Sequence, residues 1–274
     1  MKSASCTKML TYGGVSRALA RAAEQGELGP LETAGRLVGC EGLVFRIRIL
    51  TSLEKKRAAR KRQQSDPFDP PEAELTLAEV ELEKHICVLN KFPVLDRHVL
   101  LVTREFVSQE EPLTLDDFQA LADLAKENDD RWLAFYNCGS ESGRSQPHKH
   151  LQLVPYPFES DVSQVEDENI WERMPFVAEW RHVESWVQAE HNYRMYRDVL
   201  EWLKINSQLT SSHNVLLSPH RLVVIPRRAE ECEGISVNAL GFCFSLFAAN
   251  AEGAAKIEEL GPLGLLKSVG LAKK

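Results

Sequence analysis

Residues 146–155 read Gln-Pro-His-Lys-His-Leu-Gln-Leu-Val-Pro and carry the strongest structural signal in the chain. From Pro147 on, their alternating pattern predicts a β-strand, which the final proline should end. Because successive side chains of a strand point to opposite faces, His148, His150 and Gln152 are expected to line one face. The preceding residues 139–146 are rich in Gly and Ser, so two imidazoles and one amide would face a polar loop.

On either side of this stretch, strand-like and helix-like patterns alternate without a regular βαβ order. Strands are predicted at residues 44–50, 84–90, 98–103 and 132–137, and in a hairpin over 214–225 that turns at residues 218–220. Helices are predicted at residues 14–24, at 114–127, in a segment ending near 205, and through most of 236–274. Thr114 and Asp117 form a capping-box pattern. We therefore predict an α+β fold on an antiparallel sheet.

The composition is that of an ordinary globular protein, since 43% of the 274 residues are hydrophobic and 27% are charged. This balance excludes wholesale disorder and a collagen-like structure. The net charge of −7 disfavours a duplex nucleic-acid binder, which usually carries a basic surplus. No apolar run has the length of a membrane-spanning helix, and residues 1–6 lack the apolar stretch of a secretory signal. We expect a cytoplasmic protein.

The six cysteines are scattered along the chain and include no Cys-x-x-Cys pair. This spacing excludes zinc ribbons and thioredoxin-like redox motifs. A chain of this length can bury a core without disulfide bonds, so we expect reduced thiols.

Six basic residues crowd into residues 55–62, and the proline-rich segment 66–71 follows them. The prolines forbid regular structure directly after the basic run. The run is either a solvated connector or a flexible loop that steers phosphate groups, because ammonium and guanidinium groups match phosphate oxygens. The sequence leaves both interpretations open.

Four interpretations compete for the strand face that carries the two histidines. It can be a structural strand face, a metal site, a nucleotide-binding surface without chemistry, or a site of covalent catalysis. A zinc site would need further ligands, and Gln152 is a poor one, so we expect no protein-bound metal. A neutral imidazole, in contrast, is a good nucleophile toward phosphorus and forms a phosphoramidate that a second nucleophile can break.

Covalent catalysis is the interpretation that we favour. The ring nitrogen that does not attack must be held by an acceptor, and His148 can orient the His150 ring or bind phosphate. The amide of Gln152 can donate to a developing phosphoryl charge. Backbone N–H groups of the loop 139–146 can point at phosphate oxygens.

The segment 146–152 resembles the His-x-His-x-Gln signature of the transferase branch of the histidine-triad superfamily. That branch includes galactose-1-phosphate uridylyltransferase and the ATP adenylyltransferases, which are diadenosine tetraphosphate phosphorylases. The hydrolases of the superfamily carry a third His where this chain has Gln152, and the Gln favours an acceptor other than water. Further segments resemble the adenylyltransferases, namely residues 52–56, 66–68, 89–93, 101–106, 136–137, 143–146, 214–217, 223–227 and 236–242.

The resemblance implies a histidine-triad-like antiparallel sheet flanked by helices. Residues 1–166 would form the catalytic region, and residues 167–274 a C-terminal region that completes the same fold. It also implies a reversible, ping-pong phosphorolysis of diadenosine tetraphosphate to ATP and ADP through an adenylyl-histidine, with an ADP sulfurylase side activity. A divalent cation, expected to be Mg²⁺, would be bound with the substrate polyphosphate.

Carried over by position, the resemblance assigns His150 as the nucleophile, with His148 and Gln152 beside it in the catalytic site. The expected substrate-binding residues are Lys55, Asn90, Lys91, Asn137, Gly143, Arg144, Ser145, Gln146, Gln152, Asn238, Ala239, Leu240 and Ser245. The chain departs from the family pattern at Phe244 and Ala249, where a small residue and a Lys are expected. The second departure would remove a contact to a substrate phosphate.

The expected partners are small molecules: diadenosine polyphosphates, ATP, ADP and phosphate. We expect no nucleic acid, no membrane and no obligate protein partner. Two alternatives remain open, which are uridylyl transfer between sugar phosphates and a dinucleotide-binding module without catalysis.

Overall fold

The computed structural model describes residues 11–29, 35–50, 66–77, 82–125, 132–156, 164–167, 169–207 and 211–273. The basic run 55–62, with the predicted substrate ligand Lys55, lies outside these residues. The main strands are β3 His85–Leu89, β4 Val99–Thr103, β5 Trp132–Cys138, β6 His150–Pro155, β7 Glu179–His182, β8 His213–Leu217 and β9 Arg221–Pro226. Among the described residues these seven strands form one sheet in the order β3-β4-β6-β5-β8-β9-β7, and every neighbouring pair is antiparallel. The predicted α+β fold on an antiparallel sheet is confirmed.

The large sheet draws its strands from both predicted regions of the chain. At its centre β5, from the region 1–166, pairs with β8, from the region 167–274. The two regions therefore share one sheet, while the position of the boundary between them stays a prediction. The predicted hairpin over 214–225 is confirmed by the antiparallel pairing of β8 with β9.

A smaller sheet contains β1 Gly35–Cys40, β2 Leu43–Ile49 and β12 Ser245–Ala248. β1 and β2 form an antiparallel hairpin, and β12 pairs with β2 in parallel. The prediction of a mostly helical tail is therefore incomplete, because four residues of the tail form a strand. Although β2 alternates apolar with charged residues, Arg48 is buried, and its guanidinium donates to the Ser245 hydroxyl of β12 over 2.8 Å.

Helices cover both faces of the large sheet. They are α1 Tyr12–Glu24, α3 Leu115–Ala125, α4 Ile170–Arg173, α5 Ala189–Ser207, α6 Ala251–Leu260 and α7 Pro262–Val269. The predicted capping box begins α3, since the Thr114 amide donates to the Asp117 carboxylate over 2.7 Å and the Asp117 amide donates back to the Thr114 hydroxyl over 3.4 Å. These two bonds satisfy amide groups that the first turn of a helix leaves without partners.

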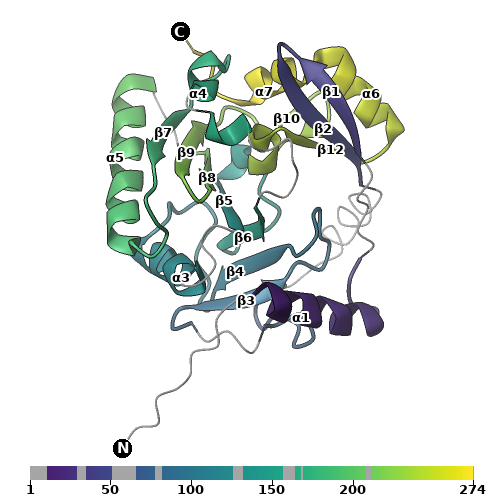
Figure 1. The fold of residues 1–274 in the computed structure, drawn as a ribbon, viewed down its shortest axis with the longest axis vertical. Helices are drawn as coiled ribbons and strands as arrows, with labels where there is room; N and C mark the ends of the chain where they lie inside the picture. The colour runs from purple at the N-terminus through teal and green to yellow at the C-terminus, as the bar shows by residue number, and fades with distance from the viewer. Residues whose placement is uncertain are drawn as a thin grey trace, which may run out of the picture.

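The large sheet separates two hydrophobic cores. α3 and α5 pack together over one face, and the smaller sheet lies with α6 and α7 on the other side (Figure 1). Leu151 and Leu153 of β6 belong to the first core, and Val154 belongs to the second. The predicted alternation of side chains along this strand is confirmed.

A third apolar cluster lies on the second face of the sheet, at the β3 and β4 end. It contains Phe68, Val88, Leu100 and Val102 and is separate from the core beneath the smaller sheet. Sheet residues near β6 therefore form the floor of a pocket instead of the interior of a core.

Two smaller expectations can be compared with the described residues. The five cysteines in these ranges, Cys40, Cys87, Cys138, Cys232 and Cys243, are all free thiols. No helix in the described ranges combines the length and the apolar character needed to cross a bilayer.

Candidate active site

The strand that carries the histidines joins the sheet ladder at His150, three residues later than the sequence pattern predicts. Before that point His148 forms only an isolated bridge with Ser108. The Gln109 side chain provides hydrogen bonds in place of strand pairing at this point. Its oxygen accepts from the His150 amide over 2.7 Å, and its nitrogen donates to the Asn137 carbonyl over 2.9 Å. Gln109 thus replaces strand pairing where β5 and β6 separate. Sequence reasoning missed it, since a single Gln in a loop gives no periodic signal.

The His150 ring is fixed by the backbone of its own strand. Nδ1 lies 2.8 Å from the carbonyl oxygen of His148. A carbonyl only accepts, so Nδ1 carries the proton and the lone pair of the neutral ring lies on Nε2. The predicted orienting role of His148 is therefore performed by its carbonyl group, whereas its imidazole contacts Asp66 and Thr103.

Gln152 lies on the same face of β6 as His150. Its side chain is held by His98, which directly precedes β4. Its side-chain oxygen lies 2.9 Å from Nε2 of His98, and the Asn90 amide approaches the same imidazole. Because the oxygen of the planar Gln152 amide is turned toward His98, the NH₂ group on its other branch can donate to a phosphoryl oxygen. His98 is a buried residue that sequence reasoning did not single out.

A first pocket of about 490 Å³ opens beside this face. Its apolar wall includes Pro67, Phe68, Pro71 and Leu75 and residues of β3 and β4, and its polar groups are Glu72, Asn90, Lys91, Ser145, Gln146, His150 and Gln152. Apolar surface with a few polar groups suits a flat base joined to a phosphate. The Lys91 ammonium lies at the rim, 2.7 Å from the Glu72 carboxylate.

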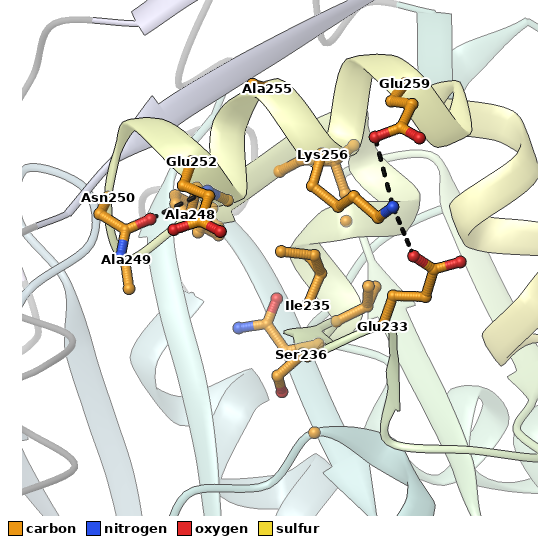
Figure 2. A pocket seen from close by; sticks show the side chains of 18 of the residues that line it. Glu233, Ile235, Ser236, Ala248, Ala249, Asn250, Glu252, Ala255, Lys256 and Glu259 are labelled. Carbon is orange, nitrogen blue, oxygen red and sulfur yellow. Dashed lines mark hydrogen bonds and ion pairs between the residues drawn. The ribbon is translucent and has the colours of Figure 1, made fainter.

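A second pocket of about 630 Å³ lies under α6. Its lining includes Gly143, residues 233–238 and the segment from Ser245 to Glu259, with the predicted substrate residues Asn238 and Ser245 and the departure Ala249. Figure 2 shows the Lys256 ammonium between the carboxylates of Glu233 and Glu259, at 2.6 and 3.3 Å. The charge of this lysine is therefore already matched by protein groups.

The loop 143–146 lies between the two pockets. Gly143 lines the second pocket, while Ser145 and Gln146 line the first. Gly143 has a φ of +78°, and a Cβ there would approach the Val237 carbonyl oxygen to 2.3 Å, so only glycine fits. The loop therefore lies where a phosphate chain would run if a ligand placed one end group in each pocket.

The structure places several predicted ligands behind the pocket walls. The Asn137 side-chain oxygen accepts from Asn214 over 2.8 Å and from the Ala239 amide over 2.9 Å, and Ala239 and Leu240 are fully buried. The Arg144 guanidinium lies 3.1 Å from the Glu110 carboxylate. None of these four residues lines either pocket, and their direct contact with substrate stays a prediction.

The guanidinium of Arg227 connects several segments beside the second pocket, and sequence reasoning gave this residue no role. Its guanidinium donates to the carbonyl groups of Ser142 and Val237 over 3.1 and 2.8 Å and to the Asn214 side chain over 2.6 Å. These bonds tie the glycine-rich loop to the floor of the second pocket. Burial lowers the pKa of Arg227 to about 9, so it still carries its charge at neutral pH.

A buried polar network supports the catalytic strand from behind. Lys149 points to the opposite face from the histidines, where its ammonium lies 2.6 Å from Asp117 of α3. The other oxygen of Asp117 lies 2.8 Å from Nε2 of His85. All three side chains are at most 2% exposed. The segment between the two histidines is thus anchored to a helix.

Comparisons with known proteins agree with this arrangement. A family model of the Ap4A (diadenosine tetraphosphate) phosphorylase N-terminal domain matches residues 4–172, and a model of the ATP adenylyltransferase C-terminal domain matches residues 172–272. The chain is 30% identical over 253 residues to diadenosine 5',5'''-P1,P4-tetraphosphate phosphorylase 2 of Saccharomyces cerevisiae, and the match covers 76% of each protein.

The fold is similar to that of solved yeast structures. The crystal structure of yeast Ap4A phosphorylase Apa2 in complex with AMP matches with a TM-score of 0.78 and 24% identity over 96% of both chains. The complex of Apa2 with Ap4A matches with a TM-score of 0.77 and 23% identity over 98% of this chain and 99% of that chain. Together the two family models span nearly the whole sequence, and the chain therefore belongs to the Ap4A phosphorylase and ATP adenylyltransferase family of nucleotidyltransferases.

Proposed function

We propose that this protein catalyses the reversible phosphorolysis of diadenosine tetraphosphate to ATP and ADP through a covalent adenylyl-His150 intermediate. The observation that carries the proposal is the orientation of His150, whose Nδ1 donates to a carbonyl so that Nε2 keeps the lone pair at the wall of the first pocket. The yeast relatives named as Ap4A phosphorylases support the choice of substrate.

In the first step Nε2 of His150 forms a bond to the α-phosphorus while the bond to the leaving phosphate oxygen breaks, and ATP departs. The His148 carbonyl holds Nδ1–H and stabilises the positive charge that the ring gains. The Gln152 amide donates to the phosphoryl oxygens. In the second step an oxygen of inorganic phosphate attacks the same phosphorus, the P–N bond breaks, and ADP departs.

The two pockets support a substrate with a nucleoside at each end of its phosphate chain. One adenosine would occupy the first pocket beside His150, and the leaving half would extend across the loop 143–146 toward the second pocket. We propose that the divalent cation is carried by the polyphosphate oxygens. A second acceptor of the adenylyl group, sulfate, would give the ADP sulfurylase side activity.

Product analysis tests the proposal directly. The protein is mixed with diadenosine tetraphosphate and Mg²⁺, with or without phosphate, and the nucleotides are separated by ion exchange. ADP and ATP that form only with phosphate would support the phosphorylase. ATP and AMP without phosphate would mean a hydrolase. No turnover would leave uridylyl transfer or a binding module, and thermal shifts with adenine dinucleotides and with UDP-sugars would separate these two.

Replacing Gln152 with histidine is expected to divert the intermediate to water. An imidazole at this position can accept a proton from water, which the amide cannot do. The AMP to ADP product ratio should rise by about tenfold, which corresponds to about 1.4 kcal/mol between competing transition states. An unchanged ratio in Gln152→His, measured at fixed phosphate, would contradict this role of Gln152.

Ala249→Lys is expected to strengthen substrate binding by restoring a cation to the second pocket. A partly exposed ion pair contributes about 0.2–1 kcal/mol, so the KM for diadenosine tetraphosphate should fall by up to about fivefold. Ala251→Lys is the matched control, because it adds the same charge to α6 outside the pocket lining. An equal effect in both variants would indicate general electrostatic attraction.

A further inference from the structure

Asp66 joins two parts of the first pocket through its two carboxylate oxygens. Oδ2 lies 2.6 Å from Nδ1 of His148, and Oδ1 accepts from the backbone N–H of Phe68 over 3.0 Å. The His148 ring is fully buried, while Asp66 is about one-fifth exposed. One carboxylate thus ties the pocket wall to the end of the strand that carries the histidines.

The His148 ring is enclosed by oxygen atoms at both nitrogens. Nε2 lies 2.8 Å from the Thr103 carbonyl oxygen and 3.0 Å from the Thr103 hydroxyl. A carboxylate only accepts, so Nδ1 donates to Asp66, while the two Thr103 groups occupy Nε2. With both nitrogens held by protein groups, the ring has no position left for a phosphate oxygen. The neighbouring charged side chain, Lys149, points to the opposite face and pairs with Asp117.

Phe68 connects this arrangement to the nucleophile. Its ring centroid lies 5.7 Å from that of His148 and 5.6 Å from that of His150. It packs in the same apolar cluster as Val88 and Leu100 and lines the first pocket. A base bound in that pocket would contact this ring, so the position of Phe68 relative to β6 determines how well the base fits.

The strand itself has independent support. The Lys149 amide donates to the Val107 carbonyl over 2.8 Å, and the Thr103 amide donates to the Lys149 carbonyl over 3.2 Å. His150 is further held by Gln109. The position of the nucleophile therefore has supports other than Asp66, whereas the Phe68 amide in the pocket wall donates to Asp66 itself.

We propose, on the basis of the proposed function, that Asp66 is a positioning residue for the nucleotide half bound beside His150. Its carboxylate fixes the Phe68 wall against a His148 ring whose two nitrogens are held by Asp66 and Thr103. His148 acts as a rigid support, and it neither binds phosphate through its ring nor transfers a proton. Loss of Asp66 should then weaken substrate binding more than it slows the chemical step.

The hydrogen bonds can be tested without any nucleotide. Protein labelled with ¹⁵N-histidine is examined by NMR at neutral pH, and the His148 signals are assigned by their loss in His148→Gln. A directly bonded proton is expected on Nδ1 of His148, and its signal should move in Asp66→Asn but not in Asp69→Asn, which changes an exposed carboxylate of the same segment. An unprotonated Nδ1 of His148 in the wild type would overturn the hydrogen bond to Asp66.

Kinetics test the positioning role. In Asp66→Asn the KM for diadenosine tetraphosphate is expected to rise about tenfold while kcat stays within about threefold, because uniform binding is lost. Asp69→Asn should match the wild type in both constants. A fall in kcat at unchanged KM would overturn the proposal. If the wild type does not turn over the dinucleotide, the proposed function fails, while the NMR result still decides the hydrogen bonding of Asp66.

Discussion

His150→Ala is expected to lower the turnover of diadenosine tetraphosphate by about four orders of magnitude or more, because the variant has no atom that can form the phosphoramidate. Loss of a covalent nucleophile has effects of this size in enzymes where the remaining groups still bind substrate. The KM should change little, since the first pocket keeps its apolar wall and the amides of Asn90 and Gln152. Steady-state assays with phosphate in excess provide the measurement.

Intact-mass analysis after incubation with substrate provides a second readout for the same variant. An added AMP is expected on the wild type and absent from His150→Ala. His191→Ala, which removes an exposed histidine on α5, should keep both the adduct and the turnover. An adduct that persists in His150→Ala would place the nucleophile elsewhere and would contradict the proposed intermediate.

Asp117→Asn is expected to destabilise the protein by about 3–5 kcal/mol, because it leaves the Lys149 ammonium buried without its carboxylate. For a chain of this size the loss corresponds to a melting temperature lower by roughly 10 °C. Asp116→Asn is the matched control at the neighbouring position, since Asp116 pairs with Lys84 in an exposed ion pair. Its melting temperature should stay close to that of the wild type. Equal melting temperatures for Asp117→Asn and Asp116→Asn would contradict the anchoring role of the network.

The same carboxylate predicts how stability depends on pH. Burial alone would raise the pKa of Asp117, but hydrogen bonds from His85 and Lys149 and the charge of Lys149 lower it from 3.8 to about 2. A lowered carboxyl pKa stabilises the folded state above the unfolded value, and this stability is lost as the pH falls from about 4 through about 2. The difference in stability between wild type and Asp117→Asn should therefore shrink over that window in urea titrations.

The parts of the fold that the sequence predicts well are those with a local period or a local pair. The alternation in residues 146–155, the Thr114 and Asp117 cap and the hairpin 214–225 each depend on residues within a few positions of one another. The strand face of His150 and Gln152 follows from the same short-range rule, and it lines the first pocket as expected.

Features that depend on distant parts of the chain could not be predicted in this way. Gln109, Arg227 and Asp66 make contacts with residues that are far away in the sequence, namely His150, Ser142 and His148. The four residues of β12 are too few to show a period. They form a strand because they pair with the edge of β2. The buried partners of Asn137, Asn214 and Ala239, likewise come from the C-terminal part of the chain, while its role as a substrate ligand stays a prediction from the family resemblance.

The pairing of β12 with β2 also bears on how the chain folds during synthesis. About 200 residues separate the two strands, and ribosomes add about 5–20 residues per second. The β1 and β2 hairpin therefore leaves the ribosome roughly 10 to 40 s before the strand that completes its sheet. During this interval the apolar side chains of Leu43, Phe45 and Ile47 lack the C-terminal half of their core. The nascent chain should be a client for chaperones until β12 emerges.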